Sequence, residues 1–428
     1  MIFRQIEDKD LAQYSYLIGC QKTKEAIIVD PQRDVQKYYE LARKEGVEIV
    51  KAVDTRIHAD YISGLREFAE RNVKVYASKE GGEDWQYEWL KNSNYDYKLI
   101  GDGDEISIGN ITLKAVHTPG HTPEHLTFLV IDKARTDEPM GALTGDFIFV
   151  GDVGRPDLLE SAAKIEGQME PSAKTLYASI QKFKENNPGL MIFPGHGSGS
   201  ACGKSLGAVP YTTLGYELEN SPALKYDNEN EFVKYILKDQ PEPPMYFARM
   251  KKENKEGPDI YKERILEKLN EPIGKVLNIT EEKHTNAIKA KPGKQVSETA
   301  GSYIEKDEDI TILGTEKLEE VKKTLMNIGL DNVKGYIEHL EEKPLRETKG
   351  RHLLDVRKNS ERQERPVDNS LHAPHTRLPE HLEKLDPENE VLVFCETGDR
   401  SERAASYLRT LGFNAKSIGG SEDAKNFI

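Results

Sequence analysis

The chain has 428 residues, of which 31% are charged and 37% hydrophobic, and its formal charge is −14. This length exceeds that of one usual domain and predicts several domains. The negative charge argues against nucleic acid or an anionic membrane surface as a partner. Because no apolar run approaches the roughly 20 residues of a spanning helix, we expect no membrane segment.

The amino terminus and the cysteine content both indicate a reducing compartment. Residues 1–11 carry charges where a secretion signal needs an apolar run, so we expect a cytoplasmic protein. The three cysteines, Cys20, Cys202 and Cys395, are too few and too far apart for a disulfide framework. They are predicted to be thiols, and at least one is a candidate for chemistry.

Residues 1–245 alternate short β-type runs with helical stretches. Strands are predicted at 26–30, 49–54, 73–77, 111–116, 126–131 and 191–193, and helices at 35–45 and 172–186. Polar residues follow the strands, which is where ligands collect in α/β folds. The proline-rich segment 240–244 and the charged segment 251–257 predict an extended connector, with a domain boundary between 245 and 257.

The remainder of the chain contains a diverged internal repeat. The strand-like run 310–313 and helical run 318–327 parallel the runs 391–394 and 401–410, and each helix is followed by a Gly-containing turn. The pattern predicts two similar small α/β domains, at 257–345 and 346–428. The first copy is two residues shorter between its strand and its turn, and we expect the loss to fall in the loop after the strand, which also lacks cysteine.

The loop 395–401 lies between a buried strand and a helix. Backbone N–H groups at such a helix start converge on an anion held by the sulfur of Cys395. The helix dipole and Arg400 both lower the pKa of a thiol there, and the same groups suit a persulfide or the sulfonate of thiosulfate. We predict that Cys395 and Arg400 are catalytic. The other loop residues are predicted to bind the substrate: Glu396, Thr397, Gly398, Asp399 and Ser401.

The pattern Cys-x-x-Gly-x-Arg-Ser after a Val-Leu-Val-Phe strand resembles the active loop of rhodanese sulfurtransferases. Residues 353–357 and 372–374 are similar to earlier landmarks of that family. The resemblance implies that Cys395 takes the outer sulfur of thiosulfate or a small persulfide and passes it to a thiol, sulfite or cyanide. Phosphatases of the Cys-x5-Arg type have five residues between the cysteine and the arginine, whereas four separate Cys395 from Arg400 here. The smaller loop suits sulfur better than a phosphate group. The alternative is that Cys395 is a buried structural thiol.

Four predicted strands in residues 1–245 end near histidine or aspartate. These segments are 54–61, 118–121, 144–146 and 194–196. Their order, Thr-x-x-His-x-Asp, Gly-His, Gly-Asp and Gly-His, resembles the metallo-β-lactamase superfamily. The resemblance implies an α/β architecture in which a metallo-β-lactamase αββα sandwich precedes two rhodanese-like domains. Tyr61 stands where many hydrolytic relatives have a second histidine, which argues against a dinuclear hydrolase.

Within that superfamily, the segments 16–30, 145–157 and 195–204 are similar to persulfide dioxygenases, and the whole chain resembles bacterial persulfide dioxygenase–rhodanese fusions. Those enzymes hold one Fe(II) with two histidines and one aspartate, the arrangement of non-haem oxygenases. The resemblance also implies that Arg155 is near the persulfide. For Cys202, contact with a persulfide and a purely structural place in its loop both stay open.

Two of the three implied iron ligands are His121 and Asp146, but the third position holds Arg56. A guanidinium stays protonated and has no lone pair for a metal. Instead, Arg56 is expected to pair with Asp146 and take the electrostatic place of the ion. His58 is a candidate substitute ligand beside His121 and Asp146. We therefore expect any Fe(II) to be weakly bound.

Three functions follow from these features. The first is a rhodanese-type sulfurtransferase of sulfide and persulfide metabolism, acting through a Cys395 persulfide and fused to a dioxygenase-like domain with an impaired iron site. The second is an active Fe(II) dioxygenase that makes sulfite, which the rhodanese domain joins to sulfur as thiosulfate. The third is a non-catalytic persulfide sensor or scaffold. We expect thiol persulfide, thiosulfate or sulfite as small-molecule partners, and a homo-oligomer.

Overall fold

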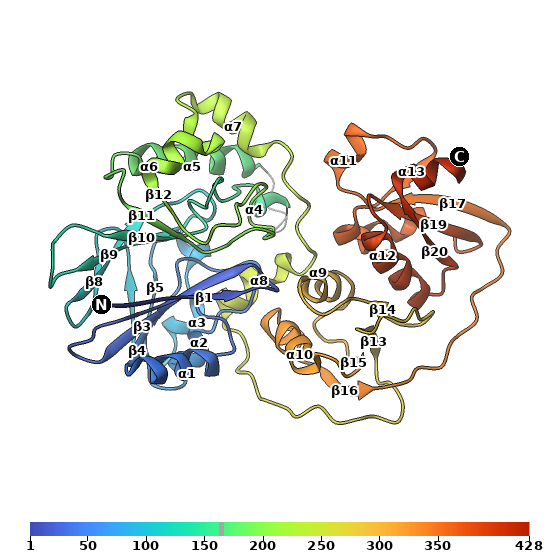
Figure 1. Cartoon of the computed structure of the whole chain (residues 1–428), viewed down its shortest axis with the longest axis horizontal. Coiled ribbons are helices and arrows are strands. Elements are labelled where there is room, and N and C mark those ends of the chain that lie inside the picture. The colour runs from blue at the N-terminus through green and yellow to red at the C-terminus, as the bar shows by residue number, and fades with distance from the viewer. Residues whose placement is uncertain (162–166, 428) are drawn as a thin grey trace. The chain divides into compact units, whose positions relative to one another are not determined.

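The computed structural model describes residues 1–161 and 167–427 (Figure 1). The chain divides into two compact units, which we call the amino-terminal unit (1–240 with 247–261) and the carboxy-terminal unit (241–246 with 262–428). Among the residues described, no helix combines the length and apolar character needed to cross a bilayer.

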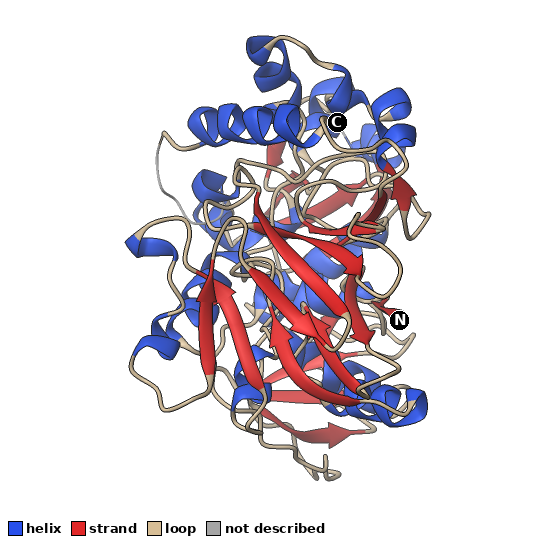
Figure 2. Ribbon diagram, turned by 90° about the vertical axis from the view of Figure 1, so that its left-hand side faces the viewer, coloured by secondary structure: helices blue, strands red, loops and turns tan. Residues whose placement is uncertain are grey.

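Two six-stranded sheets form the centre of the amino-terminal unit (Figures 1 and 2). The first contains, in spatial order, β1 (Ile2–Asp8), β2 (Gln13–Gly19), β3 (Glu25–Val29), β4 (Glu48–Val53), β5 (Lys74–Ser78) and β6 (Tyr97–Ile100). The second contains β12 (Thr212–Thr213), β11 (Met191–Pro194), β10 (Gly141–Gly145), β9 (Leu126–Asp132), β8 (Ile111–His117) and β7 (Glu105–Ile108). Apolar residues of both sheets form one buried cluster, with Ile18, Val53, Leu113 and Phe128 among its members.

Helices cover the outer face of each sheet. The first sheet packs against α1 (Gln36–Glu45), α2 (Leu65–Ala69), η1 (Glu83–Trp85) and α3 (Glu88–Lys91). The second packs against α5 (Met169–Phe183), α6 (Leu214–Asn220), η2 (Pro222–Lys225) and α7 (Glu229–Leu237), and α4 spans Leu158–Ser161. The predicted αββα sandwich is therefore confirmed. The helix predicted at 172–186 begins and ends three residues earlier, and it stops before the Asn-Pro-Gly turn at 187–189.

The extended connector predicted between 245 and 257 is wrong. Helix α8 (Phe247–Glu256) occupies this segment and belongs to the amino-terminal unit. Phe247, Met250 and Asn254 are buried at positions i, i+3 and i+7, which lie on one face of a helix. The last proline of this segment is residue 244, so no proline interrupts the helix that follows. The high content of charged residues in that stretch led to the prediction of a connector.

The carboxy-terminal unit has two four-stranded parallel sheets with the same strand order. The first comprises β14 (Ile288–Lys289), β13 (Lys275–Asn278), β15 (Ile310–Leu313) and β16 (Val333–Ile337). The second comprises β18 (Ser370–His372), β17 (Gly350–Asp355), β19 (Asn389–Cys395) and β20 (Ala415–Gly420). β15 and β19 take the same place in their sheets, as the predicted repeat of strand and helix implies, and the division into two domains stays a prediction.

Helices follow the strands of both small sheets. The first sheet is accompanied by α9 (Lys294–Tyr303) and α10 (Leu318–Asn327). The second is accompanied by α11 (Asn359–Glu364), η3 (His375–Lys384), α12 (Asp399–Thr410), α13 (Ser421–Ala424) and η4 (Lys425–Phe427). Helix α12 starts at Asp399, within the loop 395–401, so its amino terminus faces the carboxyl end of β19, as the sequence predicted. The expected loss of two residues from the loop after β15 is wrong. Helix α10 begins five positions after Leu313, as α12 begins five positions after Phe394, but α10 has 10 residues and α12 has 12.

Candidate functional site

Cys395 is the last residue of β19, and its side chain is buried. Gly398 has φ 98°, a left-handed conformation that glycine adopts without strain. This turn points the Gly398 N–H at the sulfur, with a nitrogen–sulfur distance of 3.1 Å, and the Ser401 hydroxyl lies 3.6 Å from the same sulfur. Burial raises the pKa of the Cys395 thiol, but hydrogen bonds from Ser401, Thr397 and Gly398 outweigh it and the pKa is lowered. The loop therefore favours the reactive thiolate.

Arg400 makes a two-pronged ion pair with Glu361 of α11. Its Nη1 and Nη2 lie 2.6 and 2.7 Å from the two carboxylate oxygens. Burial would raise the pKa of Glu361, but the hydrogen bond from Arg400 lowers it, so the carboxylate stays charged. Sequence reasoning missed Glu361, which precedes Arg400 by 39 positions and belongs to no motif. The guanidinium is thus fixed beside the loop, and its predicted contact with a leaving anion stays a prediction.

The remaining loop residues divide between side-chain and backbone contacts. Glu396 pairs with Arg365 at 2.7 Å, and Asp399 accepts a hydrogen bond from Gln295 at 2.9 Å. Thr397 is exposed and offers its backbone N–H to the sulfur, as Gly398 does. The five residues predicted to bind substrate therefore surround Cys395, and whether they contact a substrate stays a prediction.

In the amino-terminal unit, Arg56 occupies the centre of the predicted metal site. Its side chain is 1% exposed, and its Nη2 lies 2.6 Å from Asp146 Oδ2 and 3.4 Å from Asp60 Oδ1. Burial disfavours the charged guanidinium, but Asp146 and Asp60 outweigh this and raise its pKa. Within the described part of the chain, Arg56 Nε and Nη1 have no hydrogen-bond partner.

His196 links the same two carboxylates. Its Nδ1 lies 2.6 Å from Asp146 Oδ1 and its Nε2 lies 2.7 Å from Asp60 Oδ2. Burial would lower the pKa of His196, but the two carboxylates raise it to about 9. Two cations, Arg56 and His196, therefore balance two anions, Asp146 and Asp60.

His121 lies beside this cluster without joining it fully. Its Nδ1 is 2.8 Å from the backbone oxygen of Arg155, and its Nε2 is 3.3 Å from Asp146 Oδ2. Burial lowers the pKa of His121 to about 4, so the ring is neutral. Over residues 1–161 and 167–427, no group hydrogen-bonds to its Nε2. The structure thus brings His121 and Asp146 together, and the Arg56 guanidinium contacts the same Asp146 oxygen that His121 approaches.

The structure groups His58 with Asp30 and Asp54, and its predicted use as a substitute ligand beside His121 and Asp146 stays a prediction. His58 Nε2 lies 3.2 Å from Asp30 Oδ1 and 3.0 Å from the Tyr61 hydroxyl. Asp30, Asp54 and His58 form a buried group of their own, with the donor atoms within 4.8 Å of one another.

Arg155 and Cys202 are both buried. Arg155 pairs with Asp157 through Nε and Nη2 at 2.8 and 2.6 Å, and its Nη1 donates to the Ala201 carbonyl at 3.0 Å. Cys202 groups with Asp60 and His196. Burial, with the nearby carboxylates of Asp60 and Asp146, raises the pKa of Cys202 well above that of a free thiol. Contact of either residue with a persulfide stays a prediction.

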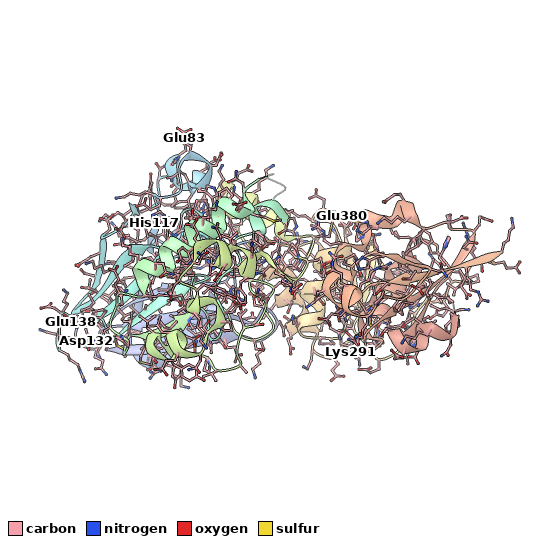
Figure 3. All side chains as sticks on the ribbon, turned by 90° about the horizontal axis from the view of Figure 1, so that it is seen from above. Glu83, His117, Asp132, Glu138, Lys291 and Glu380 are labelled. Atoms are coloured by element: carbon pink, nitrogen blue, oxygen red, sulfur yellow. The ribbon has the colours of Figure 1, made fainter. Side chains whose placement is uncertain are left out.

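Glu83, Glu138 and Lys291, which the stick view labels, are exposed (Figure 3). A surface ion pair gains little because water screens it.

Comparison with known proteins finds two families along the chain. Residues 8–196 match the model of the metallo-β-lactamase superfamily, and residues 338–424 match that of the rhodanese-like domain. Fold and sites thus define a class of protein, in which a metallo-β-lactamase-fold domain precedes a rhodanese-like domain.

Individual relatives refine this assignment. Mitochondrial persulfide dioxygenase ETHE1 of Mus musculus is 31% identical over 205 residues, which are 46% of this chain and 68% of that protein. The Bos taurus protein is 30% identical over 206 residues with the same shares. A metallo-β-lactamase structure from Staphylococcus aureus subsp. aureus COL has 40% identity and a TM-score of 0.73, and the match covers 79% of this chain and 98% of that one. The chain belongs to the metallo-β-lactamase superfamily and, within it, to the family of the ETHE1 persulfide dioxygenases.

Proposed function

We propose that the protein acts in sulfide and persulfide metabolism as a sulfurtransferase that works through Cys395. The observation that carries this proposal is the sulfur of Cys395 at the end of β19, 3.1 Å from the Gly398 N–H and before the amino terminus of α12. Such a cradle stabilises the thiolate and an added outer sulfur by the same N–H groups.

The transfer needs no external oxidant. The Cys395 thiolate attacks the outer sulfur of a thiol persulfide, so a new S–S bond forms as the old one breaks and the thiolate of the carrier leaves. A second thiol or sulfite then attacks this outer sulfur, takes it as a new persulfide or as thiosulfate, and returns the Cys395 thiolate. With thiosulfate as donor, sulfite is the leaving group.

Replacing the nucleophile tests this function. We expect Cys395→Ser to abolish transfer from thiosulfate and from glutathione persulfide, because a serine hydroxyl is not ionised and cannot hold the sulfur. Cys20→Ser is the matched control and should keep the parent rate. Equal rates for the parent chain and Cys395→Ser would favour the sensor or scaffold function.

For the amino-terminal domain we propose a persulfide-binding pocket with little or no oxygenase activity. The residues present do not fit an iron site, because Arg56 Nη2 lies 2.6 Å from the Asp146 oxygen that would hold the ion. A guanidinium has no lone pair, and its charge repels a metal cation. The unpartnered N–H groups of Arg56 suit a persulfide anion, as does the proximity of Cys202.

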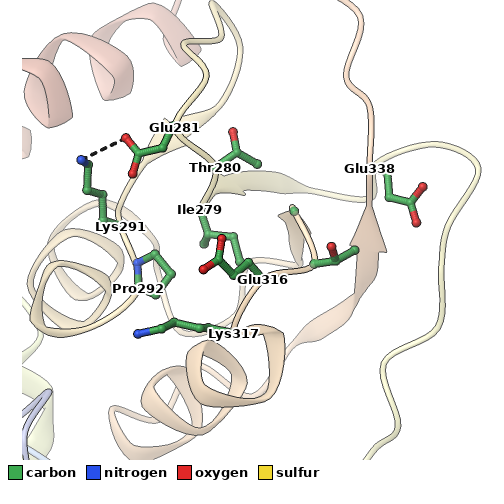
Figure 4. A pocket seen from close by; sticks show the side chains of 10 residues that line it. Ile279, Thr280, Glu281, Lys291, Pro292, Glu316, Lys317 and Glu338 are labelled. Carbon is green, nitrogen blue, oxygen red and sulfur yellow. Dashed lines mark ion pairs between the residues drawn. The ribbon is translucent and has the colours of Figure 1, made fainter.

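For the first small domain of the carboxy-terminal unit we propose a degenerate rhodanese domain. Its strand order matches that of the second, but the loop after β15 is Gly-Thr-Glu-Lys without a cysteine. A cavity of about 470 Å³ opens at this loop (Figure 4). Its lining includes Glu316 and Lys317 of the loop and the ion pair between Glu281 and Lys291. Without a cysteine in this loop, we propose that the domain takes no covalent part in sulfur transfer.

A further inference from the structure

Helix α12 turns one face toward the preceding small domain, which we call the middle domain and define as residues 262–345. Both belong to the carboxy-terminal unit. The contacting residues on α12 are Asp399, Arg403, Ser406 and Tyr407, at positions i, i+4, i+7 and i+8, which form one stripe of a helix. The contact therefore runs along α12 from its first residue to its last full turn.

The strongest contact on this face joins Glu298 of α9 to Arg403. Glu298 Oε2 lies 2.6 Å from Arg403 Nη1, and the Thr299 hydroxyl accepts a hydrogen bond from the same nitrogen at 3.0 Å. Burial would raise the pKa of Glu298, but Arg403 lowers it to about 2. The Arg403 side chain is 5% exposed and that of Glu298 is 28% exposed, so the carboxylate from the middle domain balances a largely buried charge.

Three further contacts from the middle domain hold the same helix. Gln295 donates to Asp399 at 2.9 Å, and the Lys289 backbone N–H donates to the Ser406 hydroxyl at 2.8 Å. Tyr303 stacks on Tyr407 with ring centroids 4.2 Å apart and planes 7° apart. These contacts fix the helix in position and in rotation about its axis.

The position of α12 determines the geometry around the sulfur. Asp399, its first residue, lies between Gly398 and Ser401, both of which contact Cys395 Sγ. Arg403 Nη2 also lies 3.3 Å from Asp399 Oδ2, so Glu298, Arg403 and Asp399 form one chain of contacts to the loop. A misplacement of about 1 Å at reacting groups can cost about a hundredfold in rate.

We infer that the middle domain positions the sulfur-transfer loop, and that Glu298 is the positioning residue, acting through Arg403. This inference rests on the proposed sulfurtransferase function. It assigns a role to a domain that has no nucleophile of its own. Glu298 contacts neither Cys395 nor the loop directly, so its effect is on the placement of the groups that do.

The test compares Glu298→Gln with the parent chain at full length. We expect kcat for sulfur transfer from thiosulfate to fall by about tenfold to about a hundredfold, with KM changed less, because Glu298 lies away from the substrate loop. The pH midpoint for alkylation of Cys395 by iodoacetamide should rise, because the N–H groups around the sulfur lose their alignment. Glu338→Gln is the matched control. Glu338 lies in the same domain, 2.7 Å from Lys268, and is exposed, so this change should leave kcat and the alkylation profile as in the parent.

A double substitution identifies the route. If Glu298 acts through Arg403, adding Glu298→Gln to Arg403→Gln should lower kcat no further. Additive losses would overturn the route through Arg403. A Glu298→Gln protein with parental kcat and a parental alkylation profile would overturn the inference.

Two readouts keep this inference distinct from the proposed function. The alkylation profile reports on the loop even if the parent chain transfers no sulfur, in which case the proposed function fails by itself. If the Glu298→Gln protein loses its cooperative thermal transition, the inference is tested with Gln295→Ala instead. Gln295 also contacts Asp399, and because it is partly exposed its replacement should leave the fold intact. A raised alkylation midpoint in that variant supports the inference, and a parental midpoint overturns it.

Discussion

At the scale of single residues, the two sites handle buried charge in different ways. The thiolate of Cys395 is stabilised by N–H groups of the loop, while Arg400 nearby is neutralised by Glu361. In the amino-terminal unit, Arg56 pairs with Asp146, so the cluster is neutral as it stands. A buried charge needs such a partner, because its transfer from water is costly. Arg56 therefore supplies the counter-charge for Asp146 in this cluster.

Arg56→His should create an iron site. The change removes the cation beside Asp146 and puts an imidazole in its place. Together with His121 and Asp146, this imidazole gives the two-His, one-carboxylate set of non-haem iron sites. We expect about one iron per chain after anaerobic loading with Fe(II), with oxygen uptake on glutathione persulfide. The parent chain should show neither. Arg66→His serves as control, and stoichiometric iron in the parent chain would contradict the account of Arg56.

The buried side chain of His375 should make the free energy of unfolding depend on pH. Its ring is 3% exposed, and neither ring nitrogen has a hydrogen-bond partner within the described ranges. Burial and the Arg403 charge lower its pKa to about 3. The unfolded chain binds a proton near pH 6.5, whereas the folded chain does not. Stability is therefore intact above pH 6.5 and falls by about 1.4 kcal/mol per pH unit as the pH drops toward 3.

Calorimetry between pH 4 and 7 checks this dependence on His375. His375→Leu removes the titrating group at similar volume, so the transition temperature of the variant should fall less on acidification than that of the parent. The exposed His339, in the same unit, gives the control His339→Leu. Parallel pH curves for the parent and His375→Leu would show that His375 does not carry the effect.

At the scale of elements, α8 completes the amino-terminal unit from a distance in sequence. Asn254 Nδ2 donates to the carbonyl oxygens of His58 and Tyr61 at 2.8 and 2.9 Å. Its Oδ1 accepts from the Ser63 N–H at 2.9 Å. One buried side chain thus satisfies three backbone groups of the loop that carries Arg56 and His58.

Asn254→Ala should lower the free energy of unfolding by about 2 to 4 kcal/mol, because buried backbone groups without partners each cost about 1 to 3 kcal/mol. Urea denaturation measures this. Asn220→Ala is the control, since Asn220 is exposed and donates to a carbonyl within its own helix, and it should cost less than about 0.5 kcal/mol. Equal losses in the two variants would mean that α8 does not support the loop.

Much of the fold could be predicted from sequence, because buried strands such as 26–30 and 126–131 have continuous apolar runs and clear turns after them. Helix α8 could not, because its burial depends on only three residues within a charged stretch. At the sites, Cys395, Arg56 and Asp146 stood out by motif. The partners Glu361 and Glu298 did not, because only the folded chain brings these ordinary surface-type residues to an arginine.

At the scale of the whole molecule, the chain passes between its two units more than once. Residues 241–246 belong to the carboxy-terminal unit, yet 247–261 return to the amino-terminal unit. The carboxylate of Glu242 accepts a hydrogen bond from the Asn359 N–H at 3.0 Å, which is one contact between the segment 241–246 and the rest of the carboxy-terminal unit. No single cut of the chain therefore yields both units complete.

Limited proteolysis tests this arrangement. The segment 262–265 is exposed, with Ile265 at 90% exposure, and it contains Lys262 and Arg264 as trypsin sites. We expect the two fragments of a cut there to remain associated on size exclusion, because 241–246 stays bound to the carboxy-terminal unit. Glu242→Ala should weaken the association. If the fragments of the parent chain separate immediately after cleavage, the segment 241–246 does not hold them together.

The cluster of Arg56, Asp146, His196 and Asp60 has a consequence for the folding of this loop. Its two acidic and two basic side chains pair with one another. Their charges therefore balance without an added ion, so the buried carboxylates need no metal to offset them when the chain folds.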